Sequence, residues 1–153
     1  MDLGTFGAIM NFALEVENEI SRFYMSASEC VMNQNLADLF SDLSNRGQKR
    51  VKTLERVRRE NVTEMILEPI IGLNSDNYQL VTEIPSGVEQ KDVKELAIEI
   101  EKGLLEFYTH AAAKIDFLIE AAYSFELLSE ANEKALQHLS SLRDSTGDRA
   151  VSY

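Results

Sequence analysis

The sequence LSNRGQKR, residues 43–50, places two unusual residues on the apolar face of a long amphipathic helix. The apolar positions around it are spaced alternately by four and three residues, a pattern typical of one helix face buried in a core. Gly47 and Arg50 occupy two of these positions, where leucine, phenylalanine or alanine is usual. Glycine destabilises a helix interior by about 1 kcal/mol relative to alanine, and arginine carries a permanent charge. The prediction of function therefore depends on what Gly47 and Arg50 do in the core of the protein.

Three other segments show the same alternating spacing, so the chain is predicted to contain four long helices. Each predicted apolar face has one polar residue near its centre. The four faces are Phe6, Met10, Ala13, Glu17, Ile20, Tyr24, Ala27 and Val31; then Leu36, Phe40, Leu43, Gly47, Arg50, Leu54 and Val57; then Ala97, Glu101, Leu104, Tyr108, Ala111 and Ile115; then Ala121, Phe125, Leu128, Asn132, Ala135, Leu139 and Leu142. Between the first two faces, Asn35 is the predicted cap of the second helix.

Residues 61–90 lack a long periodicity and contain both prolines, Pro69 and Pro85. This segment is long enough to run the whole length of a 25-residue helix, about 38 Å at 1.5 Å per residue. We therefore expect a crossover between two helical hairpins, packed on the bundle through its apolar residues and containing a short helix. Residues 143–153 are polar, and we expect a flexible C-terminal tail.

The two halves of the sequence repeat each other. Glu15-Val16-Glu17 followed by Phe23-Tyr24 recurs 84 residues later as Glu99-Ile100-Glu101 followed by Phe107-Tyr108, and Phe40, Leu43 and Ser44 recur as Phe125, Leu128 and Ser129. Two related hairpins joined by one long connection predict an all-α, ferritin-like four-helix bundle over residues 1–142. An up-and-down bundle with short loops is the alternative, which the 30-residue connection disfavours.

The doubled Glu…Phe-Tyr and Phe-x-x-Leu-Ser patterns resemble the rubrerythrin-like branch of the ferritin-like superfamily, over about residues 3–142. The resemblance implies one glutamate from each of the first and third helices and a Glu-x-x-His from each of the others, together holding two irons. It also implies peroxide or oxygen reduction, or ferrous iron oxidation. The rubredoxin-like iron site of full rubrerythrins needs four cysteines, and this chain has one.

The family ligand positions are only partly retained. By the resemblance, Glu17 and Glu101 match the two single glutamates and are the residual metal-ligand candidates. The two Glu-x-x-His motifs are lost, because their positions are occupied by Gly47 and Arg50 in the second helix and by Asn132 and Ala135 in the fourth. His110 and His138 lack the Glu-x-x-His spacing, and we interpret them as flank or surface residues.

Arg50 stands at a position that the resemblance assigns to a metal ligand, and this has a chemical consequence. It cannot ligate a metal, and it places a positive charge where the cations would lie. We expect Arg50 to turn inward and bridge Glu17 and Glu101, with Gly47 leaving it room; the alternative is that Arg50 extends to the rim and Gly47 merely permits close helix contact. Tyr24 and Tyr108 are expected to bond these carboxylates, which completes a predicted core polar layer of Glu17, Arg50, Glu101, Asn132, Tyr24 and Tyr108.

Composition limits the remaining function classes. A net charge of −11 disfavours binding to nucleic acid or to anionic membranes. Cys30 is the one cysteine, and we expect it to be a buried or semi-buried thiol. The sequence shows neither a basic leader nor an apolar run of about 18 residues, which a membrane-spanning helix would need. We therefore expect a cytoplasmic protein.

The sequence favours a scaffold, partner-binding or regulatory protein without a cofactor over an enzyme. We expect a homodimer that uses the apolar residues of the crossover. One alternative is a divergent iron oxidoreductase, of peroxidase or ferroxidase type, that retains Glu17 and Glu101 as ligands. Another is a binding module that holds a small anion at Arg50.

Overall fold

The computed structural model describes residues 1–61 and 69–142, so the predicted C-terminal tail lies outside the described residues. Four long helices make up this part of the chain: α1 (Phe6–Cys30), α2 (Gln34–Glu60), α3 (Gln90–Lys114) and α4 (Ile119–Ser141). A short 3₁₀ helix, η1 (Ser75–Tyr78), lies in the segment between α2 and α3. The all-α class and the four-helix bundle are confirmed. None of the helices described is long and apolar enough to cross a membrane.

Polar side chains fix where the first two helices begin. The Thr5 hydroxyl accepts a hydrogen bond from the Ala8 backbone N–H at 3.0 Å and so caps α1. The cap of α2 is Asn33, whose side chain accepts from the Leu36 N–H at 3.1 Å, so the cap predicted at Asn35 is wrong by two residues. Asn35 belongs to the first turn of the helix instead.

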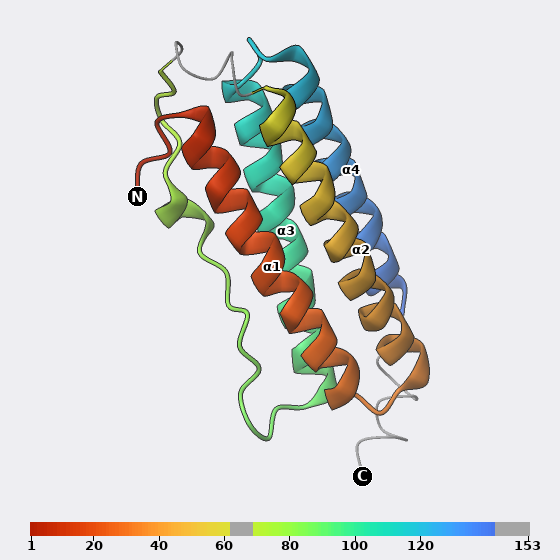
Figure 1. The fold of residues 1–153 in the computed structure, drawn as a ribbon. Coiled ribbons are helices and arrows are strands. Elements are labelled where there is room, and N and C mark those ends of the chain that lie inside the picture. The colour runs from red at the N-terminus through yellow and green to blue at the C-terminus, as the bar shows by residue number, and fades with distance from the viewer. Residues whose placement is uncertain (62–68, 143–153) are drawn as a thin grey trace.

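The four helices form two antiparallel hairpins packed side by side. α1 packs along α2 and α3 packs along α4, while α1 also contacts α3 and α2 contacts α4 (Figure 1). In Figure 1, α1 and α4 run in one direction along the bundle and α2 and α3 run in the other. Every helix therefore has antiparallel neighbours.

The segment from residue 69 to residue 89 runs along the outside of the bundle, towards the end at which α3 begins (Figure 1). At its start it pairs with the N-terminal residues, because the Leu3 N–H donates to the Leu73 carbonyl at 2.9 Å and the Ile70 N–H donates to the Gly4 carbonyl at 3.0 Å. Further along, Leu80 packs so closely on α3 that a Cβ at Gly103 would lie 2.4 Å from its Cδ2. A side chain at position 103 would force the Leu80 side chain to move.

Burial confirms the four predicted apolar faces. All of their residues are buried except Arg50 and Leu142, which are partly buried. Two crossover residues, Ile70 and Leu73, also belong to this core, with 5% and 1% exposure. These two residues are therefore not available for the predicted dimer contact, whereas Ile71 is 77% exposed and remains available; Met65, Ile66 and Leu67 lie outside the described residues.

Candidate functional site

Each helix contributes one polar residue to the same level of the core. Glu17 of α1, Glu101 of α3 and Asn132 of α4 are 1%, 4% and 1% exposed. The Arg50 side chain of α2 is 14% exposed, and it points inward rather than to the rim. Since these groups are buried or nearly buried, each needs a hydrogen-bond partner.

A chain of hydrogen bonds connects the four side chains. Arg50 Nε donates to Glu17 Oε2 at 2.9 Å, and Arg50 Nη2 donates to Asn132 Oδ1 at 3.1 Å. Asn132 Nδ2 then donates to Glu101 Oε1 at 2.7 Å. Arg50 therefore hydrogen-bonds Glu17 directly, as predicted, but its hydrogen-bonded connection to Glu101 runs through Asn132. Asn132 connects them because its amide can accept from the guanidinium and donate to the carboxylate at the same time.

Two tyrosines bond the carboxylates reciprocally between the hairpins. The Tyr24 hydroxyl of α1 donates to Glu101 Oε2 of α3 at 2.5 Å, and the Tyr108 hydroxyl of α3 donates to Glu17 Oε2 of α1 at 2.5 Å. Burial, together with the carboxylate that each phenol bonds, raises the pKa of both tyrosines well above the ordinary value. Both hydroxyls therefore remain donors throughout the physiological range of pH.

Arg50 keeps its charge in this layer. Burial by itself lowers the pKa of the guanidinium, but the Glu17 carboxylate and its neighbours more than offset this and raise the pKa above its ordinary value. The guanidinium carbon also lies 5.4 Å from the centre of the Tyr108 ring, within the range of a cation–π contact. A permanent cation thus lies in the middle of the layer.

Gly47 lies where α2 approaches α1 closely. A Cβ at this position would lie 3.2 Å from the Ser21 Cβ and 3.4 Å from its Oγ. Beside it, the Ser21 hydroxyl donates to the Ser44 carbonyl at 3.1 Å, and the Ser44 hydroxyl donates to the Ser21 carbonyl at 3.0 Å. The structure thus combines the two alternatives: Arg50 is inward, and Gly47 permits close helix contact. Ser21 was missed by the sequence prediction, although Ser44 belongs to the repeated pattern.

The residues at this level do not fit a di-iron centre. The four positions that the resemblance would assign to Glu-x-x-His motifs supply one amide, one guanidinium and no imidazole. Both carboxylates of the layer are bonded by tyrosine, asparagine or arginine donors. His110 and His138 are exposed, and His110 bonds the Tyr78 hydroxyl at 2.7 Å. Residues 1–61 and 69–142 contain no group of three or more histidine, cysteine, aspartate or glutamate side chains placed to hold a metal ion.

A cavity of about 120 Å³ lies against the layer. Its wall includes Arg50 and both carboxylates, together with Gly47 and Ala135, whose side chains are too small to fill the space. Two carboxylates and two arginines, Arg46 and Arg50, line the cavity, so its wall has no excess of positive charge for the small anion considered as an alternative ligand. The cavity therefore lies beside two positions, 47 and 135, at which the side chains are small.

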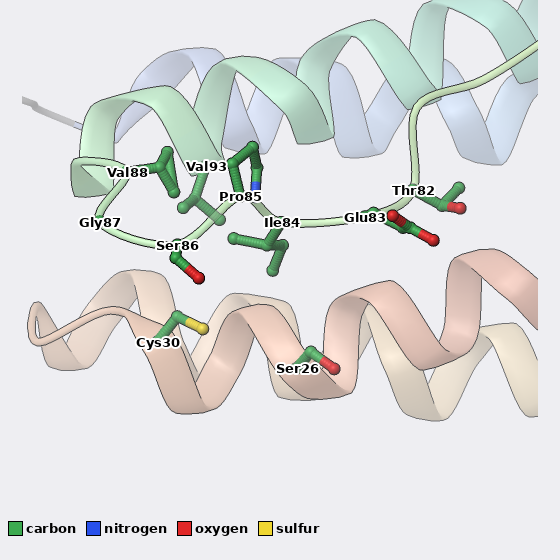
Figure 2. A pocket seen from close by; sticks show the side chains of 10 residues that line it. All are labelled: Ser26, Cys30, Thr82, Glu83, Ile84, Pro85, Ser86, Gly87, Val88 and Val93. Carbon is green, nitrogen blue, oxygen red and sulfur yellow. The ribbon is translucent and has the colours of Figure 1, made fainter.

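A larger pocket of about 670 Å³ separates the C-terminal part of α1 from the crossover. Figure 2 shows Ser26 and Cys30 of α1 facing the crossover segment that contains Ile84 and Ser86. Cys30 is exposed, so the expectation of a buried or semi-buried thiol is wrong. Cys30 is the last residue of α1, and it faces the pocket between α1 and the segment that contains Ile84 and Ser86. None of the charged groups of the core layer lines this pocket.

The Glu101 carboxyl should make stability depend on pH. Burial raises its pKa, and this effect is only partly offset by Arg50 and by the hydrogen bonds from Tyr24 and Asn132. Because the folded-state pKa is the higher one, the folded state holds the proton more tightly, and its stability should fall as pH rises through that pKa. Glutamine at position 101 cannot ionise. As the pH is raised from 5 to 8, the free energy of unfolding of Glu101→Gln, measured with urea, should therefore fall less than that of the wild type. Parallel pH profiles of the two proteins would contradict this prediction.

Comparisons of the chain with protein-family models, with curated proteins and with solved structures find no match.

Proposed function

We propose that this chain is a ferritin-like bundle of the rubrerythrin-like type in which a hydrogen-bonded charged layer replaces the di-iron centre. It acts as a non-catalytic scaffold, partner-binding or regulatory protein in the cytoplasm. Two related antiparallel hairpins and a crossover that runs along the bundle support the ferritin-like assignment. The observation that carries the proposal is the Arg50 guanidinium, whose Nε lies 2.9 Å from Glu17 Oε2.

The arrangement of the layer explains why catalysis is not expected. A di-iron oxidoreductase needs open coordination positions and ligands that can lose a proton to the metal. Here both carboxylates accept short hydrogen bonds, and the charge that metal ions would supply is supplied by an arginine that cannot deprotonate. Arg50 therefore neutralises the buried Glu17 carboxylate, Tyr24 and Asn132 hydrogen-bond Glu101, and we infer that the function lies on the surface of the bundle.

Metal loading tests the proposal. After incubation with ferrous iron under nitrogen and removal of unbound metal, elemental analysis of the wild-type chain is expected to find no iron above the level of an unrelated control protein. Peroxide consumption should equal that of the buffer. Iron retained at close to one equivalent per chain or more would overturn the proposal and favour the divergent oxidoreductase.

A gain-of-metal variant tests the placement of the layer. Gly47→Glu, Arg50→His, Asn132→Glu and Ala135→His together should restore the missing donors, and we expect roughly two irons per chain. Since a new Cβ at position 47 would lie 3.2 Å from Ser21 Cβ, a second version should also carry Ser21→Gly. The control retains Arg50 and carries the other three changes, and it should bind little iron. A folded fourfold variant without iron in either version would show that these positions are not the ligand positions.

A further inference from the structure

Helix α4 carries a line of apolar side chains that are exposed in the part of the chain that the structure describes. Ile119, Tyr123 and Leu127 follow one another at intervals of four residues and are 79%, 59% and 46% exposed. Ala131, the next residue at this interval, is also exposed. Single exposed apolar residues are ordinary, but four on one line of a helix form a continuous face. The core contacts of α4 are made by a different face, which includes Phe125, Leu128 and Leu139.

The residues of this outward face are arranged almost symmetrically about Leu127. Four residues away on either side lie Tyr123 and Ala131, a large side chain and a small one. Seven residues away on either side lie Glu120 and Lys134, which are exposed and opposite in charge. Seven residues correspond to about 10 Å along the helix axis. Reversing the direction of the helix about Leu127 therefore places a small side chain opposite a large one, and a cation opposite an anion.

We propose that two copies of this chain pair through their α4 helices, antiparallel, around a two-fold axis at Leu127. The two Leu127 side chains meet at the axis, Tyr123 packs on Ala131 of the second copy, and Glu120 pairs with Lys134 of the second copy. Because the axis is two-fold, each of these unlike contacts occurs twice. The inference is independent of the proposed function, since it uses the surface of α4 and not the polar layer.

Charge selects this arrangement over a parallel one. The chain carries a net charge of −11, so two copies repel each other and any stable contact must avoid opposed carboxylates. A parallel pairing would place Glu120 opposite Glu120 and Lys134 opposite Lys134. The antiparallel pairing turns both of these repulsive contacts into attractive ones and also keeps Glu130 opposite Ser124 of the second copy.

Sedimentation equilibrium of the full chain tests the proposal. From 1 to 100 µM, we expect the mass to approach twice the chain mass of 17.3 kDa. Leu127→Glu places two carboxylates at the axis and should raise the dimer dissociation constant at least about 100-fold. The matched control is Val81→Glu, because Val81 is an exposed apolar residue of the crossover at 64% exposure, and it should leave the dimer intact. A wild-type monomer at 100 µM, or a dimer unaffected by Leu127→Glu, would overturn the inference.

Charge reversal tests the direction of the helices. Glu120→Lys and Lys134→Glu should each weaken the homodimer, because each creates two like-charged contacts. An equimolar mixture of these two variants should form a heterodimer, since both cations of one copy then face both anions of the other. In a parallel dimer, by contrast, neither single change would add like-charged contacts, and that result would refute the antiparallel arrangement. Circular dichroism of every variant should show unchanged helix content.

Discussion

The Arg50→Leu variant is expected to lose about 3–5 kcal/mol of unfolding free energy at pH 7, the range for removing one partner of a buried ion pair. Leucine removes the donor that bonds Glu17 and leaves that carboxylate, only 1% exposed, without its counter-charge. It also leaves Asn132 Oδ1 without its guanidinium donor. In a chain of this size the loss corresponds to a fall in melting temperature of roughly 6–20 °C. Urea unfolding followed by circular dichroism measures the change directly.

A second change separates the lost charge pair from lost packing. In the Arg50→Leu background, Glu17→Gln removes the buried charge and keeps an acceptor for the Tyr108 hydroxyl, so it should recover at least about half of the lost stability. Arg59→Leu, on the exposed face of the same helix, is the matched control and should change stability by less than about 0.5 kcal/mol. If Glu17→Gln destabilises the Arg50→Leu variant further, the ion pair is not what Arg50 contributes.

The Asn132→Asp variant is expected to be destabilised strongly at pH 8, by roughly 2–4 kcal/mol, and much less at pH 5. The change keeps the shape of the side chain but replaces the amide that donates to Glu101 Oε1 at 2.7 Å with a carboxylate oxygen. Two carboxyl groups at this distance cannot both ionise readily, so the pKa of one of them is raised in the folded state. With the higher pKa in the folded state, stability is fully present below the unfolded pKa and is lost as pH rises.

Urea unfolding at pH 5, 6.5 and 8 measures this dependence. The control is Asn18→Asp, which introduces the same charge on the exposed surface of α1 and should alter stability little at any of the three values. A loss for Asn132→Asp that is the same at pH 5 and pH 8 would mean that Glu101 and the new carboxyl do not interact.

The buried faces of the helices were predictable because one physical cause, burial of apolar surface, controls their spacing. The repeat then placed Glu17 and Glu101 at one level, since two related hairpins bring equivalent positions together. The pairing of the polar side chains was not predictable in the same way. Coulomb attraction alone allowed Arg50 to reach either carboxylate, and only the side-chain positions reveal that Asn132 lies between Arg50 and Glu101.

The outward face of α4 was not predicted for a related reason. Its residues recur every four positions, as core residues do, so periodicity alone does not separate it from the face that packs on the bundle. Exposure of Ile119, Tyr123 and Leu127 in the structure makes that distinction. In the crossover, which the sequence predicts as the contact surface, Ile70 and Leu73 cover the chain's own core while Ile71 is exposed, so exposure again separates residues that the pattern groups together.

The reciprocal bonds of Tyr24 and Tyr108 have a consequence for the uniqueness of the native state. Leucine and alanine side chains can still bury their surface if one helix slides past another by a turn, about 5.4 Å, but these hydrogen bonds cannot survive that movement. A layer made wholly of apolar residues could therefore be more stable and yet less specific, as buried polar groups in other helical assemblies indicate. The charged layer makes one axial alignment of α1 and α3 far more favourable than its neighbours.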